Sequence, residues 1–176
     1  MMLKKRLFIK KWSKVGRSGD FFCIFAVGMR FLGNIEAKAD AKGRVFLPAT
    51  FRKVLQQEGS ERLVLRKDVH EKCLVLYPEW VWNEQMDNLR SRLNRWNKQQ
   101  QQVFRHFVSD VETLSLDGNG RFLIPRRFQE MAGIEQCVRF IGVGDTIEIW
   151  AEEEYSKFAE QKDNFANILE EMMSSE

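Results

Sequence analysis

One nine-residue pattern occurs twice in the chain, and this pattern decides the fold. The first copy is Asp40-Ala41-Lys42-Gly43-Arg44-Val45-Phe46-Leu47-Pro48, and the second is Asp117-Gly118-Asn119-Gly120-Arg121-Phe122-Leu123-Ile124-Pro125. Asp, Gly, Arg and Pro occupy the same places in both copies, and apolar residues fill the positions between Arg and Pro. We therefore interpret the chain as two copies of one structural unit.

Each copy predicts a tight turn followed by a returning strand and a short helix. The Asp side chain can accept a hydrogen bond from a backbone N–H two residues on, and Gly supplies the positive φ that a chain reversal needs. Pro stops strand pairing and presets φ for a first helical position. The turn-forming residues are thus Asp40, Gly43, Pro48, Asp117, Gly120 and Pro125.

The flanking segments repeat as well. Residues 35–39 and 111–116 alternate as half-buried strands do, and 74–77 and 147–150 are strand-like runs that end in an aromatic residue. The short helices should bury one face each, formed by Phe51, Val54 and Leu55 in the first unit and by Phe128, Met131 and Ala132 in the second, with Gly133 ending the second helix.

Helical spacing fills the remaining chain. We expect a helix from Glu79 to about Trp96, a second from Asn97 to Phe107, and a final amphipathic helix over 152–173. The predicted fold class is α+β, with an extension at 1–28, a first repeat at 29–78, connecting helices at 79–107, a second repeat at 108–151 and a C-terminal helical region at 152–176.

Composition favours an ordered domain with a core. Of the 176 residues, 44% are hydrophobic and 30% are charged, which argues against a disordered or fibrous chain. The net charge is +3, but residues 1–28 hold seven Lys/Arg and one Asp, so the rest of the chain comes to 21 − 24 = −3. A polyanionic partner would therefore have to be bound by local clusters of cations.

The three cysteines, Cys23, Cys73 and Cys137, lie far apart and predict neither a metal site nor a disulfide framework. This pattern fits a reducing cytoplasm, and the apolar run 21–27 is too short to cross a membrane. Residues 1–28 resemble a secretory signal in outline. We favour a translated upstream stretch with the biological start at Met29, because the apolar run is short and the basic region before it is long.

The sequence does not predict an enzyme. It has two histidines, His70 and His106, neither in a recognisable nucleophile context, and it lacks phosphate-loop, dinucleotide-binding and nucleophile-elbow motifs. We therefore expect no cofactor, no metal and no small-molecule substrate.

The paired motifs resemble the MraZ family of bacterial transcriptional regulators. The resemblance also includes residues 29–33, 74–78 and 148–150 and extends from Met29 to about residue 165. It implies two AbrB-like halves that interleave their hairpins into one pseudo-symmetric β core with flanking helices, and protomers joined in a ring. It also implies a cytoplasmic, nucleoid-associated repressor that binds short direct repeats in double-stranded DNA at the promoter of its own division and cell-wall gene cluster.

If the chain binds DNA, cations near the two turns would make the contacts, because phosphates attract cations and arginine can pair with guanine. The candidates are Lys38, Lys42, Arg44 and Arg52 in the first unit and Arg121, Arg126 and Arg127 in the second. Asn119 replaces the first turn's lysine, so we expect the first turn to contribute more.

Two alternatives remain open. Arg44 and Arg121 could pair only with Asp40, Asp117 or their equivalents and serve the fold. AbrB-like domains also occur in antitoxins, which bind a toxin partner through a flexible tail, although here the tail has a helical pattern and the turn motif is duplicated within one chain.

Overall fold

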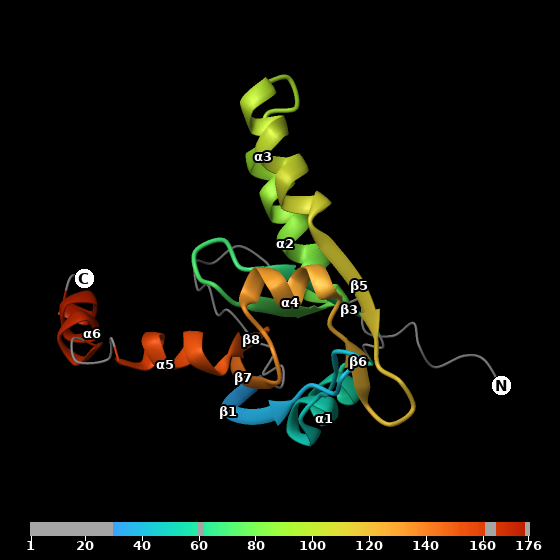
Figure 1. Ribbon diagram of the computed structural model, residues 1–176. Helices are drawn as coiled ribbons and strands as arrows, with labels where there is room; N and C mark the ends of the chain where they lie inside the picture. The colour runs from blue at the N-terminus through green and yellow to red at the C-terminus, as the bar shows by residue number, and fades with distance from the viewer. Residues whose placement is uncertain (1–29, 60–61, 161–164, 175–176) are drawn as a thin grey trace, which may run out of the picture.

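The computed structural model describes residues 30–59, 62–160 and 165–174. The predictions for residues 1–28 lie outside this range. The described chain forms a β core from which two helical arms project, one formed by a helical hairpin and the other by the C-terminal helices (Figure 1).

The two repeats contain the same elements in the same order. The first has β1 (Phe31–Lys38), β2 (Arg44–Phe46), α1 (Ala49–Gln57), β3 (Arg62–Lys67) and β4 (Leu74–Pro78). The second has β5 (Val111–Ser115), β6 (Arg121–Leu123), α4 (Arg126–Ala132), β7 (Cys137–Gly144) and β8 (Ile147–Ala151). Between them lie α2 (Glu79–Arg92) and α3 (Lys98–Ser109), and α5 (Glu152–Glu160) and α6 (Phe165–Ser174) follow. The predicted α+β class is confirmed.

The two halves exchange strands. The main sheet has the order β1-β7-β8-β4-β3-β5, and every neighbouring pair in it is antiparallel. The edge strand β1 of the first half pairs with β7 of the second, and the edge strand β5 of the second pairs with β3 of the first. If each strand is replaced by its equivalent in the other half, β1 by β5, β3 by β7 and β4 by β8, the same strand order results, read from the opposite edge. A pseudo-twofold axis therefore passes between β4 and β8.

The short strands β2 and β6 form a separate two-stranded ribbon, again one strand from each half. Val45 pairs with Phe122 at its centre, and both side chains are buried in the core. Backbone hydrogen bonds extend the pairing at both ends, from Leu47 N–H to Gly120 O and from Ile124 N–H to Gly43 O, each 3.0 Å. The interleaving implied by the family resemblance is thus present in this fold.

The first short helix buries the face that its spacing predicts, formed by Phe51, Val54 and Leu55. The second buries Phe128 and Ala132, but the prediction for Met131 was wrong, because its side chain is 37% exposed. Helix α4 has only seven residues and ends at Gly133 in the left-handed region. The reversal brings Ile134 into the core, where it supplies the apolar contact expected of Met131.

The three prolines of the chain each stand immediately before a helix, Pro48 before α1, Pro78 before α2 and Pro125 before α4. Their ψ angles lie between 140° and 144°, so each is the last extended residue rather than the first helical one as predicted. A fixed φ and a missing N–H are compatible with this boundary position.

The predicted helix from Glu79 to Trp96 ends earlier, at Arg92, because Leu93 adopts an extended conformation. A short turn follows, and the Asn97 side chain caps α3 by accepting a hydrogen bond from Gln100 N–H. Helices α2 and α3 thus form a hairpin that projects from the sheet (Figure 1). Its base is fixed where the Trp82 and Phe107 rings stack, with centroids 5.1 Å apart.

The C-terminal region contains two described helices, where one continuous helix was predicted. Helix α5 packs on the sheet, because the Tyr155 and Phe158 rings contact Trp150 with centroids 6.3 and 5.1 Å away. Every described residue of α6 is exposed. Within the described ranges, all helices are too short or too polar to cross a bilayer.

The turn geometry leads to a matched pair of glycine variants. Gly120 has φ of +79°, and a Cβ there would collide with the Arg52 side chain, whereas Gly118 faces open space. We expect Gly120→Ala to lower the free energy of unfolding by at least about 1 to 2 kcal/mol and Gly118→Ala to leave it within about 1 kcal/mol of wild type. Urea denaturation measures both. Equal effects would show that the backbone conformation at Gly120 is not required.

Candidate nucleic-acid interface

Each turn is closed by its aspartate. Asp40 Oδ1 accepts hydrogen bonds from the N–H groups of Lys42 (2.9 Å) and Arg44 (3.0 Å), and Asp40 Oδ2 accepts one from Arg44 Nε (2.7 Å). Asp117 makes the same three contacts with Asn119 N–H, Arg121 N–H and Arg121 Nε, all at 2.9 Å. The turn residue and the arginine four positions later therefore form one unit in both halves.

These contacts stabilise the ionised aspartates. The backbone N–H of Arg44 and then its side chain hold the pKa of Asp40 at about 2, below its usual value of 3.8. The pKa of Asp117 is lowered by the equivalent contacts with Arg121. Each arginine thus has the structural pairing that one of the open alternatives expected.

Pairing does not bury the arginines. The Arg44 side chain is 39% exposed to solvent and the Arg121 side chain 26%. Both lie on the outer face of the β2–β6 ribbon. Phe46 and Leu123 lie on the same face, 53% and 49% exposed, and the Arg121 guanidinium is 5.5 Å from the Phe46 ring centroid. The ribbon therefore presents two cations and two apolar side chains to solvent.

Sequence reasoning missed the outward position of Phe46 and Leu123, which it treated only as apolar residues between Arg and Pro. In a β-strand every second residue lies on the same face, so counting two positions on from Arg44 and from Arg121 identifies Phe46 and Leu123 as their outward neighbours. Strand alternation sends Val45 and Leu47 inward and leaves Arg44 and Phe46 outward.

Each short helix packs against the turn of the other half. Arg52 of α1 donates a hydrogen bond from Nη1 to Asn119 O at 3.2 Å. Gln129 of α4 lies beside Gly43 of the first turn, and its Nε2 donates a hydrogen bond of 2.6 Å to Ile124 O of its own half. The prediction had grouped Arg52 with the first turn, and this grouping was wrong because the halves are interleaved. Arg52 therefore supports the second turn.

Lys42 and Arg126 border one groove, although they belong to different halves. The groove has a volume of about 550 Å³, and its walls include the first turn, Gln129 and Glu135. Within the described ranges, no carboxylate pairs with Lys42, whereas Arg126 Nε pairs with Glu130 at 3.0 Å with both side chains largely exposed. Lys38, at the end of β1, is exposed as well.

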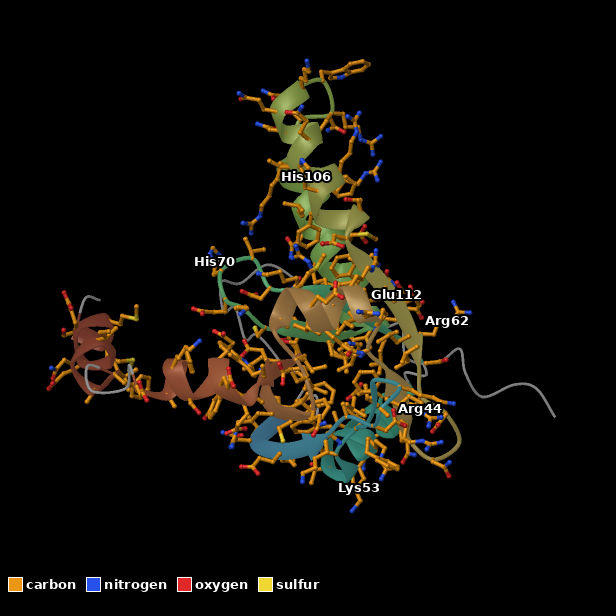
Figure 2. The ribbon with its side chains drawn as sticks, viewed as in Figure 1. Arg44, Lys53, Arg62, His70, His106 and Glu112 are labelled. Carbon is orange, nitrogen blue, oxygen red and sulfur yellow. The ribbon has the colours of Figure 1, made fainter. Side chains whose placement is uncertain are left out.

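Arg127 contacts strand β5. Its Nη2 donates to Glu112 Oε2 at 2.9 Å and to Val111 O at 3.1 Å, so it links α4 to β5. Figure 2 shows the labelled Arg44 and Lys53 at one end of the molecule and His106 on the helical hairpin toward the other. The candidate interface thus consists of the ribbon face with Lys38, Lys42 and Arg126 around it.

A family model described as "MraZ protein, putative antitoxin-like" matches residues 30–106 and again residues 107–175, one match for each repeat. The chain belongs to the MraZ family.

Curated MraZ proteins are similar over most of their length. The protein named transcriptional regulator MraZ of Phocaeicola vulgatus is 62% identical over 147 residues, which cover 84% of this chain and 96% of that protein. Its namesakes from Bacteroides thetaiotaomicron and Christiangramia forsetii are 55% and 34% identical, each with 84% of this chain covered and 95% and 96% of their own lengths.

In the described part of the chain, no three His, Cys, Asp or Glu side chains are arranged to hold a metal ion. His70 lies in the loop between β3 and β4, and His106 lies in the last turn of α3.

The aspartate contacts predict an acid-sensitive fold. Because the folded pKa of Asp40 is depressed, its stabilising effect is complete above the unfolded value of 3.8 and is lost as the pH falls through about 2. We expect Asp40→Asn to unfold at lower urea concentration than wild type at pH 7 and to lose less further stability between pH 4 and 2. Urea midpoints across this range measure the effect. Parallel wild-type and variant curves would contradict it.

Proposed function

We propose that this chain is a sequence-specific DNA-binding transcriptional regulator that acts as a repressor. The observation that carries the proposal is the β2–β6 ribbon, whose outer face presents Arg44 and Arg121 with Phe46 and Leu123 beside them. The major groove of B-DNA admits a two-stranded ribbon, arginine can pair with guanine, and apolar side chains can contact thymine methyl groups. The names of the curated relatives support a role in transcription rather than catalysis.

The surrounding cations suit the DNA backbone. Lys38 precedes the first turn, Lys42 lies in it, and Arg126 lines the same groove as Lys42. Phosphate contacts of this kind supply affinity and fix orientation, while the ribbon reads bases. Because Arg44 and Arg121 are held by the turn aspartates, their guanidinium groups are already oriented before DNA arrives.

Few cations act in each protomer, so one protomer should bind weakly. We propose that protomers assemble in a ring and engage direct repeats together, which raises the effective concentration of each ribbon at its site. Likeness to the family supports the chain's own promoter and the division and cell-wall gene cluster as the target, and a cytoplasmic, nucleoid-associated location. An antitoxin role has less support, since the C-terminal region forms helices rather than a loose tail.

The two turns offer a matched test of the phosphate contacts. Lys42 and Asn119 occupy equivalent positions, and the hydrogen bond from Arg52 to Asn119 goes to the backbone carbonyl, which a side-chain substitution keeps. We expect Lys42→Ala to weaken binding to all DNA sequences and to reduce the salt slope by about one, and Asn119→Lys to change both quantities in the opposite direction. Fluorescence anisotropy over a salt series measures this, with Asn119→Ala as the neutral control. An unchanged slope for Lys42→Ala would remove the lysine from the interface.

Arg44 has both a structural and a proposed DNA contact, and one pair of variants separates them. If Arg44 reads a base, Arg44→Ala should weaken operator binding by about 1 to 3 kcal/mol and relax sequence preference at that base. Asp40→Asn removes the same ion pair but keeps the arginine, so it should weaken operator binding less than Arg44→Ala does and leave the sequence preference at that base unchanged. Binding titrations on matched and mismatched operators decide between the roles. Equal losses in both variants would assign Arg44 to the fold alone.

A further inference from the structure

The tip of the α2–α3 hairpin has an unusual charge distribution. The 22 residues from Asn88 to Ser109 contain no Asp or Glu and five Lys/Arg, namely Arg90, Arg92, Arg95, Lys98 and Arg105. In the part of the chain that the structure describes, none of these five has an ion-pair partner.

Helix stability accounts for only part of this charge. Arg90 and Arg92 lie in the last turn of α2, where cations are favourable to the helix dipole. Lys98 is the first residue of α3, where a cation is unfavourable, and the first turn of α3 has no acidic residue. The positive end of α3 therefore adds to the positive charge of the tip, so an anionic group placed there would be stabilised.

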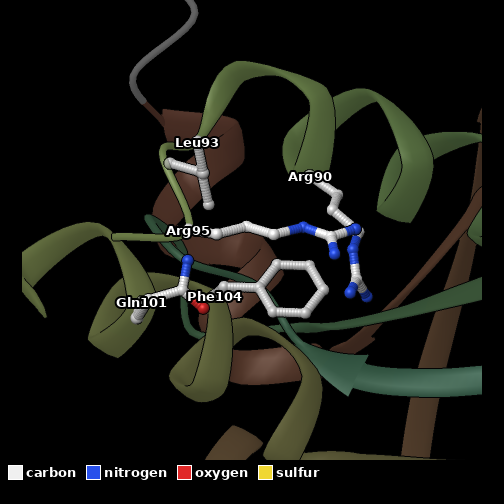
Figure 3. A pocket seen from close by; sticks show the side chains of 5 residues that line it. All are labelled: Arg90, Leu93, Arg95, Gln101 and Phe104. Carbon is white, nitrogen blue, oxygen red and sulfur yellow. The ribbon is translucent and has the colours of Figure 1, made fainter. Parts of the chain in front are cut away.

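Two arginines of the tip converge on a small pocket. Figure 3 shows the Arg95 side chain extending toward Arg90 above the Phe104 ring. The Arg90 Cζ lies 5.4 Å from the centroid of that ring, and Leu93 and Gln101 complete a pocket of about 90 Å³. The pocket thus combines an apolar base with two guanidinium groups, and Trp96 beside it in sequence is 95% exposed.

Helix α6 has the complementary chemistry. Its apolar residues recur at helical spacing and form a stripe of Phe165, Ile168, Leu169 and Met173, with exposures between 44% and 75%. Glu170 and Glu171 lie next to this stripe, and α6 contains no Lys or Arg. An apolar stripe flanked by carboxylates matches an apolar pocket rimmed by arginines.

The two surfaces of one chain project from different places. Helix α5 is tied to β1 and β7, because Arg139 pairs with Glu152 at 2.6 Å and Asn34 donates a hydrogen bond to the Tyr155 hydroxyl at 2.6 Å. Helix α2 instead contacts β3 and β4, and its 14 residues carry the tip about 21 Å from the sheet. In Figure 1 the α2–α3 tip and α6 lie at the ends of separate arms.

We infer that the hairpin tip is a docking site for α6 of a second copy of this chain. The apolar stripe packs against Leu93, Phe104 and Trp96, and Glu170 or Glu171 approaches Arg90 and Arg95. Because the two contacting surfaces differ, each copy can bind one neighbour through its tip and another through α6, which gives a head-to-tail assembly. The contact specifies how the assembly in the proposed function is held together, and it does not require DNA.

Charge reversal with rescue tests the contact. The full chain is compared by sedimentation velocity, without DNA, with Arg90→Glu/Arg95→Glu, with Glu170→Arg/Glu171→Arg and with all four changes together. We expect each double variant to weaken self-association by about tenfold or more and the fourfold variant to recover most of it, because like charges oppose docking and reversed charges again attract. Far-UV circular dichroism checks that each variant is folded, and Lys53→Glu, on α1 away from the tip, should sediment as wild type.

Several outcomes would overturn the inference. A wild-type chain that stays monomeric at micromolar concentration would do so, as would double variants that assemble normally or a fourfold variant that does not recover. If Arg90→Glu/Arg95→Glu leaves assembly intact but weakens binding to a DNA duplex, the tip contacts phosphates instead. Because assembly is measured without DNA, failure here leaves the ribbon as the proposed DNA reader.

Discussion

The pairing of β2 with β6 ties the two halves of the chain together and forms the candidate DNA surface. Each strand has three residues, and each finds its partner in the other half, with Val45 and Phe122 buried at the centre. The inner face of the ribbon is therefore part of the core, and the outer face carries Arg44 and Arg121. A displacement that moved the arginines would also disturb the core, so the packing that stabilises the fold also orients the cations.

Both halves lie in one chain, which allows them to differ where the two subunits of a homodimer would be identical. The equivalent pairs Lys42 and Asn119, and Arg52 and Gln129, differ in charge. A symmetric dimer matches a palindromic site, because operator symmetry mirrors protein symmetry. A chain whose two turns differ is not symmetric about its pseudo-twofold axis. Such a chain would suit DNA sites that are repeated in the same orientation, rather than palindromic sites.

Local chemistry explains which parts of the structure were predictable. The aspartate and glycine of each turn determine its geometry within five residues, and the spacing of Phe51, Val54 and Leu55 shows the buried face of α1. Contacts between the halves were not predictable from residues alone. Nothing local to Arg52 shows that it supports the turn around Asn119, and the extended conformation of Leu93 is not marked by Gly or Pro.

The exchanged strands also affect how the protein is made. Phe31 at the start of β1 pairs with Gly144 at the end of β7, more than a hundred residues later in the chain. A ribosome adds about 5 to 20 residues per second, so β1 is synthesised roughly 6 to 23 seconds before the end of its partner strand. During that interval the apolar residues of the first half lack the second half that buries them in the folded protein. The nascent chain therefore exposes a surface to which chaperones can bind before the fold is complete.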